Sequence, residues 1–192
     1  MKRLVASLLS CLVATSAWAT DYKIDPAHSS VSFKVRHMGI SYVPGRFMSV
    51  DGTFSYDPTN VKNSKAAATI AVSSLNTADV KRDDHLKSPE FLDAAKFKDI
   101  AFKTTSIEPV SADAFKAKGD LSIHGVTKPV VLDVTYGGSG KDPWGNERAA
   151  FTATTKINRK DFGLTWSKVL ETGQLLVGED VQIVLEIEGI KA

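Results

Sequence analysis

Apolar and polar side chains alternate with a two-residue period through most of the chain after residue 20. In the clearest run, the odd-numbered residues from Phe115 to Ile123 are apolar or glycine, and the even-numbered residues between them are polar. Such alternation is typical of β-strands that have one face in a core and one in water. Eight runs follow this pattern, with a short extra strand expected at residues 22–24: 31–36, 48–56, 66–72, a run beginning at 100, 115–123, 130–136, 151–157 and 181–187.

Residues 77–95 break the two-residue period. Charged residues cluster there, and Ser88-Pro89-Glu90 offers a capping serine followed by proline at the first helical position. We therefore predict two short helices within this segment. The glycine-rich residues 137–145 predict a loop, and residues 161–180 predict a long irregular connection.

The predicted fold is all-β, an eight-stranded antiparallel barrel with short helices inserted around residues 77–95. Eight such strands form either a sandwich or a barrel, and closure into a barrel removes the exposed edges. A barrel of this size is filled by side chains or holds one small ligand. Many inner positions are small, which favours apolar space inside, although the same residues could instead offset bulky phenylalanines. These small inner positions are Ala66, Ala68, Ala117, Gly119, Ala153 and Thr155.

The N-terminus has the pattern of a cleaved secretory signal peptide, residues 1–19. A basic start at Lys2 and Arg3 precedes an apolar stretch over residues 4–14 and the small-x-small site Ala17-Trp18-Ala19. The apolar stretch is shorter than the roughly 20 residues that span a bilayer, so no transmembrane segment is expected. Residues 20–192 are expected to form one domain in the bacterial periplasm.

Charge and cysteine content narrow the function. The chain has 24 basic and 22 acidic residues, and removal of Lys2 and Arg3 with the signal leaves 22 of each. A neutral chain lacks the basic face that nucleic-acid binding requires. Cys11, the only cysteine, leaves with the signal, so neither a disulfide nor a thiolate metal site is expected.

Five ordered motifs span essentially the whole mature chain. They are Asp25 to Ser29; Phe33 to Gly39 with Gly45 to Phe47; Arg82 to Ser88 with Phe91; Leu121 to Lys128; and Arg159 to Gly163. Together they resemble the YceI-like family of periplasmic, lipocalin-like proteins associated with polyisoprenoid binding. The resemblance implies an up-and-down barrel whose apolar tunnel holds a long-chain isoprenoid or similar amphiphilic lipid, with a quinone among the candidates.

The apolar tunnel has eight predicted lining residues and two predicted polar contacts. The polar contacts are Arg82 and His85, because a guanidinium donates to an oxyanion and histidine hydrogen-bonds a carbonyl. The alternative is that both residues cap and pair within the helical segment. The predicted lining residues are Phe33, Val35, Phe54, Ile70, Phe102, Leu121, Val134 and Phe151.

We predict a periplasmic lipid carrier rather than an enzyme, with no cofactor and with transient membrane contact. The four histidines lack the spacing that places two metal ligands together, so no metal site is expected. A hydrolase using Asp83 and His85 is less favoured, because the chain has no Gly-x-Ser-x-Gly elbow. The remaining alternative is a stress-related interaction protein with a packed barrel. Trp144, Phe162, Leu164 and Trp166 are expected to plug one end, to line a tunnel mouth or to touch a membrane.

Overall fold

The protein is described here by a computed structural model covering residues 19–192, so residues 1–18 of the predicted signal peptide lie outside the described part. Nearly all regular structure in that part is β-strand, and α1 (Val80–Lys87) is its one α-helix. Three short 3-10 helices accompany it, η1 (Val61–Asn63), η2 (Val72–Ser74) and η3 (Arg159–Phe162). The strands are β1 (Thr20–Ile24), β2 (Ser30–His37), β3 (Ser41–Phe47), β4 (Val50–Tyr56), β5 (Lys65–Ala71), β6 (Leu75–Asn76), β7 (Asp99–Pro109), β8 (Ala114–Ile123), β9 (Val126–Lys141), β10 (Glu147–Asn158) and β11 (Val177–Lys191).

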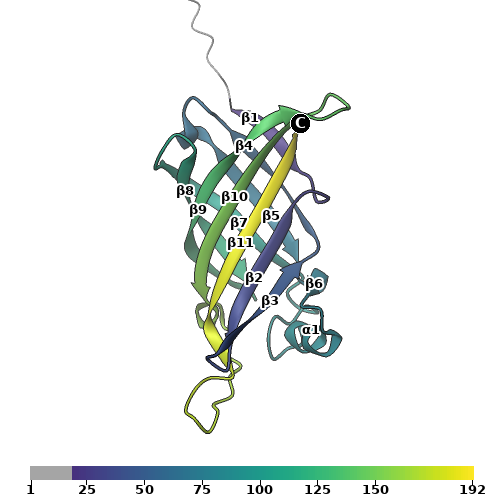
Figure 1. The fold of residues 1–192 in the computed structure, drawn as a ribbon, viewed down its shortest axis with the longest axis vertical. Coiled ribbons are helices and arrows are strands. Elements are labelled where there is room, and N and C mark those ends of the chain that lie inside the picture. Colours follow the sequence, from purple (N-terminus) through teal and green to yellow (C-terminus); the bar gives the residue numbers. More distant parts are fainter. Residues whose placement is uncertain (1–18) are drawn as a thin grey trace, which may run out of the picture.

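Eight of these strands close into an antiparallel barrel (Figure 1). The ring runs β1-β4-β5-β7-β8-β9-β10-β11, and β1 closes it by pairing with β11 at Tyr22↔Lys191. β2 pairs with the earlier part of β11, and β3 pairs with β2, so this hairpin continues the wall beyond β1 and β4. The predicted eight-stranded, lipocalin-like barrel is confirmed, as is the short strand at residues 22–24.

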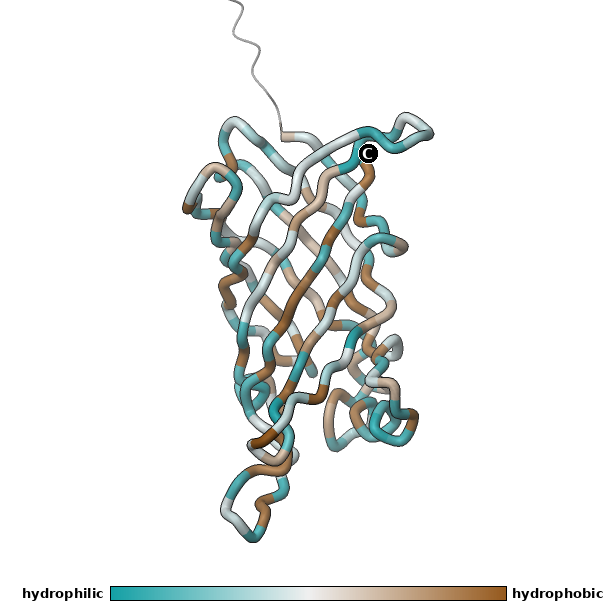
Figure 2. The backbone as a smooth tube through the Cα atoms, viewed as in Figure 1, coloured by the Kyte–Doolittle hydropathy of each residue, from teal (hydrophilic) through white to brown (hydrophobic). Residues whose placement is uncertain are grey.

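The two ends of the barrel differ in what lies there. The helix end, lower in Figure 1, carries α1, the β2–β3 hairpin and the connection over residues 163–176. The terminal end, at the top of Figure 1, carries the start of β1 and the C-terminus. Along the strands between them, hydrophobic and hydrophilic residues alternate (Figure 2). This alternation directs one set of side chains inward and the other to solvent.

The prediction of two helices in residues 77–95 is wrong, because α1 is followed by turns. Ser88 ends α1 instead of beginning a second helix, and its hydroxyl donates to the carbonyl of His85 at 2.7 Å. The chain then folds back, so that the amides of Leu92 and Ala94 bond the last carbonyls of α1. These bonds satisfy helix-terminal acceptors that a continuing helix would otherwise use. Within residues 19–192, no helix has the length and apolarity needed to cross a membrane.

The prediction of a loop over residues 137–145 is also wrong for its first half. β9 continues through Gly137–Gly140 and pairs with β10, for example at Ser139↔Ala149. A register shift between Ala150 and Phe151 leaves Gly137 as the extra residue of a bulge. Pairing with a long neighbouring strand thus outweighs the local preference of glycine for turns. The connection itself is confined to residues 142–146.

Candidate ligand cavity

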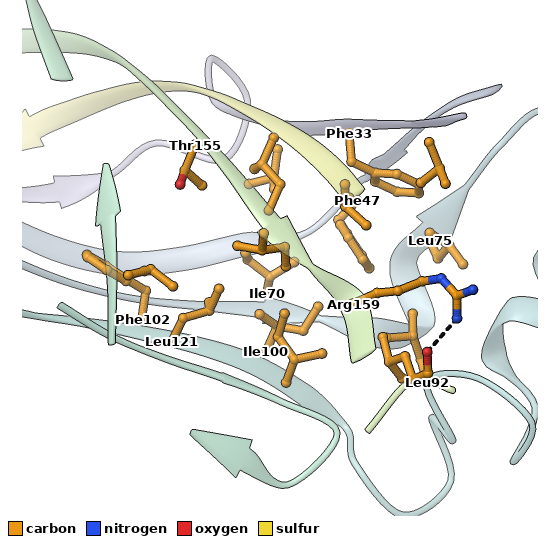
Figure 3. Close-up of a pocket in the computed structure, with 18 of the residues that line it drawn as sticks. Phe33, Phe47, Ile70, Leu75, Leu92, Ile100, Phe102, Leu121, Thr155 and Arg159 are labelled. Carbon is orange, nitrogen blue, oxygen red and sulfur yellow. Dashed lines mark hydrogen bonds between the residues drawn. The ribbon is translucent and has the colours of Figure 1, made fainter. Parts of the chain in front are cut away.

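An apolar cavity of about 170 Å³ lies inside the helix-end half of the barrel (Figure 3). Its walls come from nearly every strand and from the segment around α1. Thr155 and Arg159 are the only lining residues with polar side chains. The others are Val31, Phe33, Val35, Phe47, Ile70, Leu75, Leu86, Phe91, Leu92, Ile100, Phe102, Leu121, Ile123, Val130, Leu132, Ile157, Leu164, Val177, Val181, Ile183 and Leu185.

Five of the eight residues predicted for the tunnel line this cavity: Phe33, Val35, Ile70, Phe102 and Leu121. The period-two pattern identifies them because each lies on the inward face of its strand. Contact between these side chains and a ligand stays a prediction.

The other three, Phe54, Val134 and Phe151, lie outside the cavity lining, in the terminal-end half of the barrel. Phe54 stacks on Tyr22 with ring centres 4.9 Å apart and meets Phe151 edge-on at 5.3 Å. Phe151 also contacts Tyr56, Tyr136 and Phe115. These six rings, named here the aromatic cluster (Tyr22, Phe54, Tyr56, Phe115, Tyr136 and Phe151), fill the half in which the prediction expected tunnel.

Two glycines of the barrel wall accommodate aromatic rings. A methyl group on Gly119 would lie 2.5 Å from the ring of Phe102, and one on Gly45 would lie 2.3 Å from the ring of Phe33. Ala117 and Ala153 are buried but do not line the cavity, whereas Thr155 does. Of the six small inner positions, Thr155 lines the cavity, and Gly119 offsets a bulky ring as the alternative expected.

The segment around α1 covers the helix end of the cavity. Asp79 caps α1 by accepting from the amide of Arg82 at 3.0 Å, and the segment brings Leu86, Phe91 and Leu92 into the lining. Trp166 packs beside Phe91 with ring centres 5.1 Å apart. Helical and loop residues from distant parts of the chain thus meet at this end of the cavity.

Arg82 and His85 lie in α1, and neither lines the cavity. The guanidinium of Arg82 donates to the hydroxyl and the carbonyl of Thr77, both at 2.8 Å. The ring of His85 is hydrogen-bonded to Glu90 at 2.6 Å. Their polar atoms are therefore engaged within the segment around α1, as the alternative interpretation expected.

Asp83 and His85, the residues of the hydrolase alternative, face different partners. Asp83 is buried and accepts from the amide and the hydroxyl of Thr77 at 2.8 and 2.6 Å. His85 instead bonds Glu90. The geometry therefore gives Asp83 the role of holding α1 against Thr77, the residue that follows β6.

Arg159, which the sequence analysis did not select, lines the cavity with the aliphatic part of its side chain, because the cavity surface is entirely apolar. Its position follows from the Arg159 to Gly163 motif, which folds into η3. The side chain of Asn158 caps η3 by accepting from Lys160, Phe162 anchors it in the core, and Gly163 ends it with a left-handed φ of 78°. Only 3% of Arg159 is exposed, and burial lowers the pKa of its guanidinium, although the charge of Glu179 opposes this.

Three backbone carbonyls hold the guanidinium of Arg159. It donates to Leu164 at 2.5 Å, to Gly178 at 2.9 Å and to Val177 at 3.3 Å. The available signal in the sequence was spacing, because Arg159 lies two residues after Ile157 and so continues the inward-facing set of that run.

A second arginine, Arg148, is at the terminal end among three carboxylates. It bonds Asp25 at 2.7 Å, Asp142 at 2.9 Å and Glu188 at 2.6 Å. The hydrogen bond from Arg148, followed by that from His28, lowers the pKa of Asp25 to about 2. The carboxylate oxygens of Asp25 and Glu188 and a ring nitrogen of His28 lie within 4.8 Å of one another. The guanidinium of Arg148 supplies the positive charge at this cluster.

Comparison with known proteins gives one family. The family model for the YceI-like domain matches residues 22–189. A UPF0312 protein of Vibrio cholerae is 42% identical over 167 residues, which cover 85% of this chain and 88% of that protein.

Solved structures show the same fold. The crystal structure of a Campylobacter jejuni YceI protein is similar with a TM-score of 0.71 and 32% identity, covering 82% of this chain and 90% of that one. A polyisoprenoid binding domain from Saccharophagus degradans, implicated in plant cell wall breakdown, has a TM-score of 0.63 at 15% identity. That match covers 89% of this chain and 98% of the other.

Proposed function

This chain belongs to the YceI-like family, and from that premise we propose that it binds and carries a long-chain isoprenoid or similar amphiphilic lipid. The observation that carries the proposal is the cavity, whose lining is apolar except for Thr155 and Arg159. Polyisoprenoid binding by the domain from Saccharophagus degradans, which shares the fold, supports the same chemistry. A quinone with an isoprenoid tail belongs to the same ligand class.

Chain burial is the driving force in this proposal. Each buried methylene contributes about 0.8 kcal/mol, so ten carbons supply roughly micromolar attraction before ordering costs. The cavity of about 170 Å³ is close in size to cavities of roughly 150 Å³ that hold benzene. Part of a long chain therefore fills it, and the rest extends toward the helix end.

Lipid exchange through the helix end would bring that end to a membrane. Exposed apolar side chains lie there, with 76% of Ile40 exposed in the β2–β3 hairpin and 64% of Val169 exposed in the connection after η3. We expect Ile40→Asp to weaken co-sedimentation with lipid vesicles. Val110→Asp, at an exposed site near the terminal end, serves as the control and should leave co-sedimentation unchanged.

The periplasm is the proposed location, supported by the signal-peptide pattern of residues 1–19. Cell fractionation tests it, because a cleaved protein should appear in the periplasmic fraction with Thr20 as its first residue. Recovery of the uncleaved chain in the cytoplasm would contradict it.

Native mass spectrometry of the protein purified from its own cells, followed by organic extraction, tests the carrier function. Wild-type protein should carry a stoichiometric lipid. Ile183→Trp fills the cavity and should abolish this occupancy, whereas Val184→Trp, at the neighbouring outward position, should keep it.

A stable protein that binds neither extracted lipids nor added isoprenoids would contradict the carrier function. It would favour the alternative of a stress-related interaction protein with a packed barrel, since both cavity variants would then behave alike.

A further inference from the structure

The cavity ends at a shared boundary on three neighbouring strands. Thr155 of β10 lines it, whereas Ala153, the next inward residue toward the terminal end, is buried outside the lining. On β9 the same change falls between Leu132, which lines the cavity, and Val134, which pairs with Ala153. On β11, Leu185 is the last lining residue before the terminal end. The interior of the barrel beyond this boundary is therefore filled by protein.

The ring of Phe151 lies across the interior on the far side of this boundary. Its centre is 5.3 Å from the ring of Phe54 and 5.1 Å from the ring of Tyr56, both on β4. It is 6.1 Å from the ring of Phe115 on β8. Phe151 belongs to β10, which pairs with β9 and β11, so β4 and β8 lie elsewhere around the ring of strands. Contacts with both strands show that the ring of Phe151 reaches into the interior from its own wall.

This arrangement limits how far a lipid chain can enter. A chain entering at the helix end would fill the cavity of about 170 Å³ and then meet the aromatic cluster beyond Thr155. A cavity of roughly 150 Å³ holds benzene, so this one accommodates about one to two isoprene units. The remaining units of a longer chain would lie toward the helix end.

We propose that Phe151 is a stopper that sets how deep a chain enters, so that the protein recognises the end of an isoprenoid chain and not its full length. This inference rests on the proposed lipid binding and specifies which part of the ligand is selected. Contacts with four other rings of the aromatic cluster hold the ring of Phe151 in place, and a chain would have to break them to pass. Isoprenoids that differ only in the units outside the barrel should therefore bind alike.

The test compares farnesol with geranylgeraniol, which share one head group and differ by one isoprene unit. Binding to the full mature protein is measured by native mass spectrometry and by tryptophan fluorescence, since Trp166 lies beside Phe91 of the lining. The two wild-type affinities should differ by less than about twofold, because the added unit stays outside the cavity. Without a stopper the added unit would be buried, and geranylgeraniol would bind at least about tenfold more tightly.

Three variants separate a stopper from ordinary core packing. Phe151→Ala joins the space beyond the boundary to the cavity, so geranylgeraniol should then bind at least about tenfold more tightly than farnesol. Phe151→Leu removes less packing and should shift the ratio in the same direction. Phe54→Ala is the matched control, because it removes a ring that contacts Tyr22 and Phe151 but leaves the ring of Phe151 across the interior. It should keep the wild-type ratio.

Thermal melting shows which variants are folded, and the wild-type comparison stands without any of them. A wild type that binds geranylgeraniol clearly more tightly than farnesol would overturn the stopper. A folded Phe151→Ala or Phe151→Leu protein with the wild-type ratio would do the same. Both results leave lipid carriage intact, because the two alcohols still bind. Failure of both alcohols to bind the wild type would overturn the proposed function as well.

Discussion

The two ends of the barrel each contain an arginine, and the protein compensates the two charges differently. Arg148 at the terminal end bonds three carboxylates, whereas Arg159 at the helix end bonds only backbone carbonyls. The barrel interior also differs between the two ends. The aromatic cluster fills the terminal-end half, and the cavity occupies the helix-end half.

Within one continuous sheet, the terminal end thus contributes mainly to stability and the helix end offers the space for a ligand. Rings that contact one another on several sides and a satisfied charge cluster stabilise the terminal end without any partner. The helix end instead keeps an apolar cavity that a ligand can fill. The predictions below test whether the two halves differ in this way.

The largest expected effect is on the aromatic cluster. Phe54→Ala should lower the free energy of unfolding by about 3–5 kcal/mol, because it leaves a cavity among Tyr22, Phe151 and the backbone of Gly189. Phe102→Ala in the cavity wall should cost clearly less, because one side of that ring already borders free space. Urea unfolding monitored by circular dichroism measures both, and equal costs would show that the halves are packed alike.

Two inward positions on one strand give a sharper comparison. Ala153 is buried, and Thr155, two residues later on β10, lines the cavity. Ala153→Phe should overpack the barrel and lower the free energy of unfolding by about 1–3 kcal/mol. Thr155→Phe should be better tolerated and should abolish lipid binding. If both variants unfold at the same denaturant concentration, the space beside Thr155 is not available to a ligand.

Lowering the pH should weaken the contribution of the Arg148 cluster to stability. The pKa of Asp25 falls from its ordinary 3.8 to about 2 in the folded protein, mainly through the hydrogen bond from Arg148. A lowered pKa stabilises the fold above the ordinary value, and this stabilisation disappears as the pH falls from about 4 to about 2. The melting temperature of Arg148→Met should therefore lie well below that of the wild type near neutral pH.

The difference in melting temperature between these two proteins should narrow through the same acid range. Arg159→Met provides the control, because Arg159 has no carboxylate partner in the described chain and its effect should vary little with pH in that range. A gap for Arg148→Met that stays constant down to about pH 2 would contradict the role given to the carboxylate cluster.

The smallest effect is expected at Arg82. Arg82→Met removes two hydrogen bonds to Thr77 and should lower the free energy of unfolding by about 1 kcal/mol. Lipid affinity should stay the same, because the guanidinium is engaged within the segment around α1. A loss of lipid affinity in the folded variant would instead support the head-group contact first predicted for Arg82.

The sequence by itself predicted every strand of the closed ring, although not β3 or β6. Strict alternation in runs such as residues 115–123 leaves one way to bury the apolar face. Seven of the eight runs, together with the short strand expected at residues 22–24, form the ring, whereas the run at 31–36 is β2, which lies outside it. The same pattern identified Phe33, Val35, Ile70, Phe102 and Leu121 as inward-facing residues. Local sequence preferences failed at two places. Strand pairing with β10 overrode the turn preference of Gly137–Gly140, and Ser88 ended α1 instead of beginning a second helix.

Only the tertiary structure decided where along the barrel the free space lies. Alternation specifies whether a side chain points into the barrel but not its position along the barrel axis. Phe54 and Phe102 therefore look equivalent in the sequence, although Phe54 packs in the aromatic cluster and Phe102 lines the cavity. The different hydrogen-bond partners of Arg148 and Arg159 could not be read from the sequence either. Their partners come from segments distant in the chain, and the closure of the sheet brings carboxylates to one guanidinium and only carbonyls to the other.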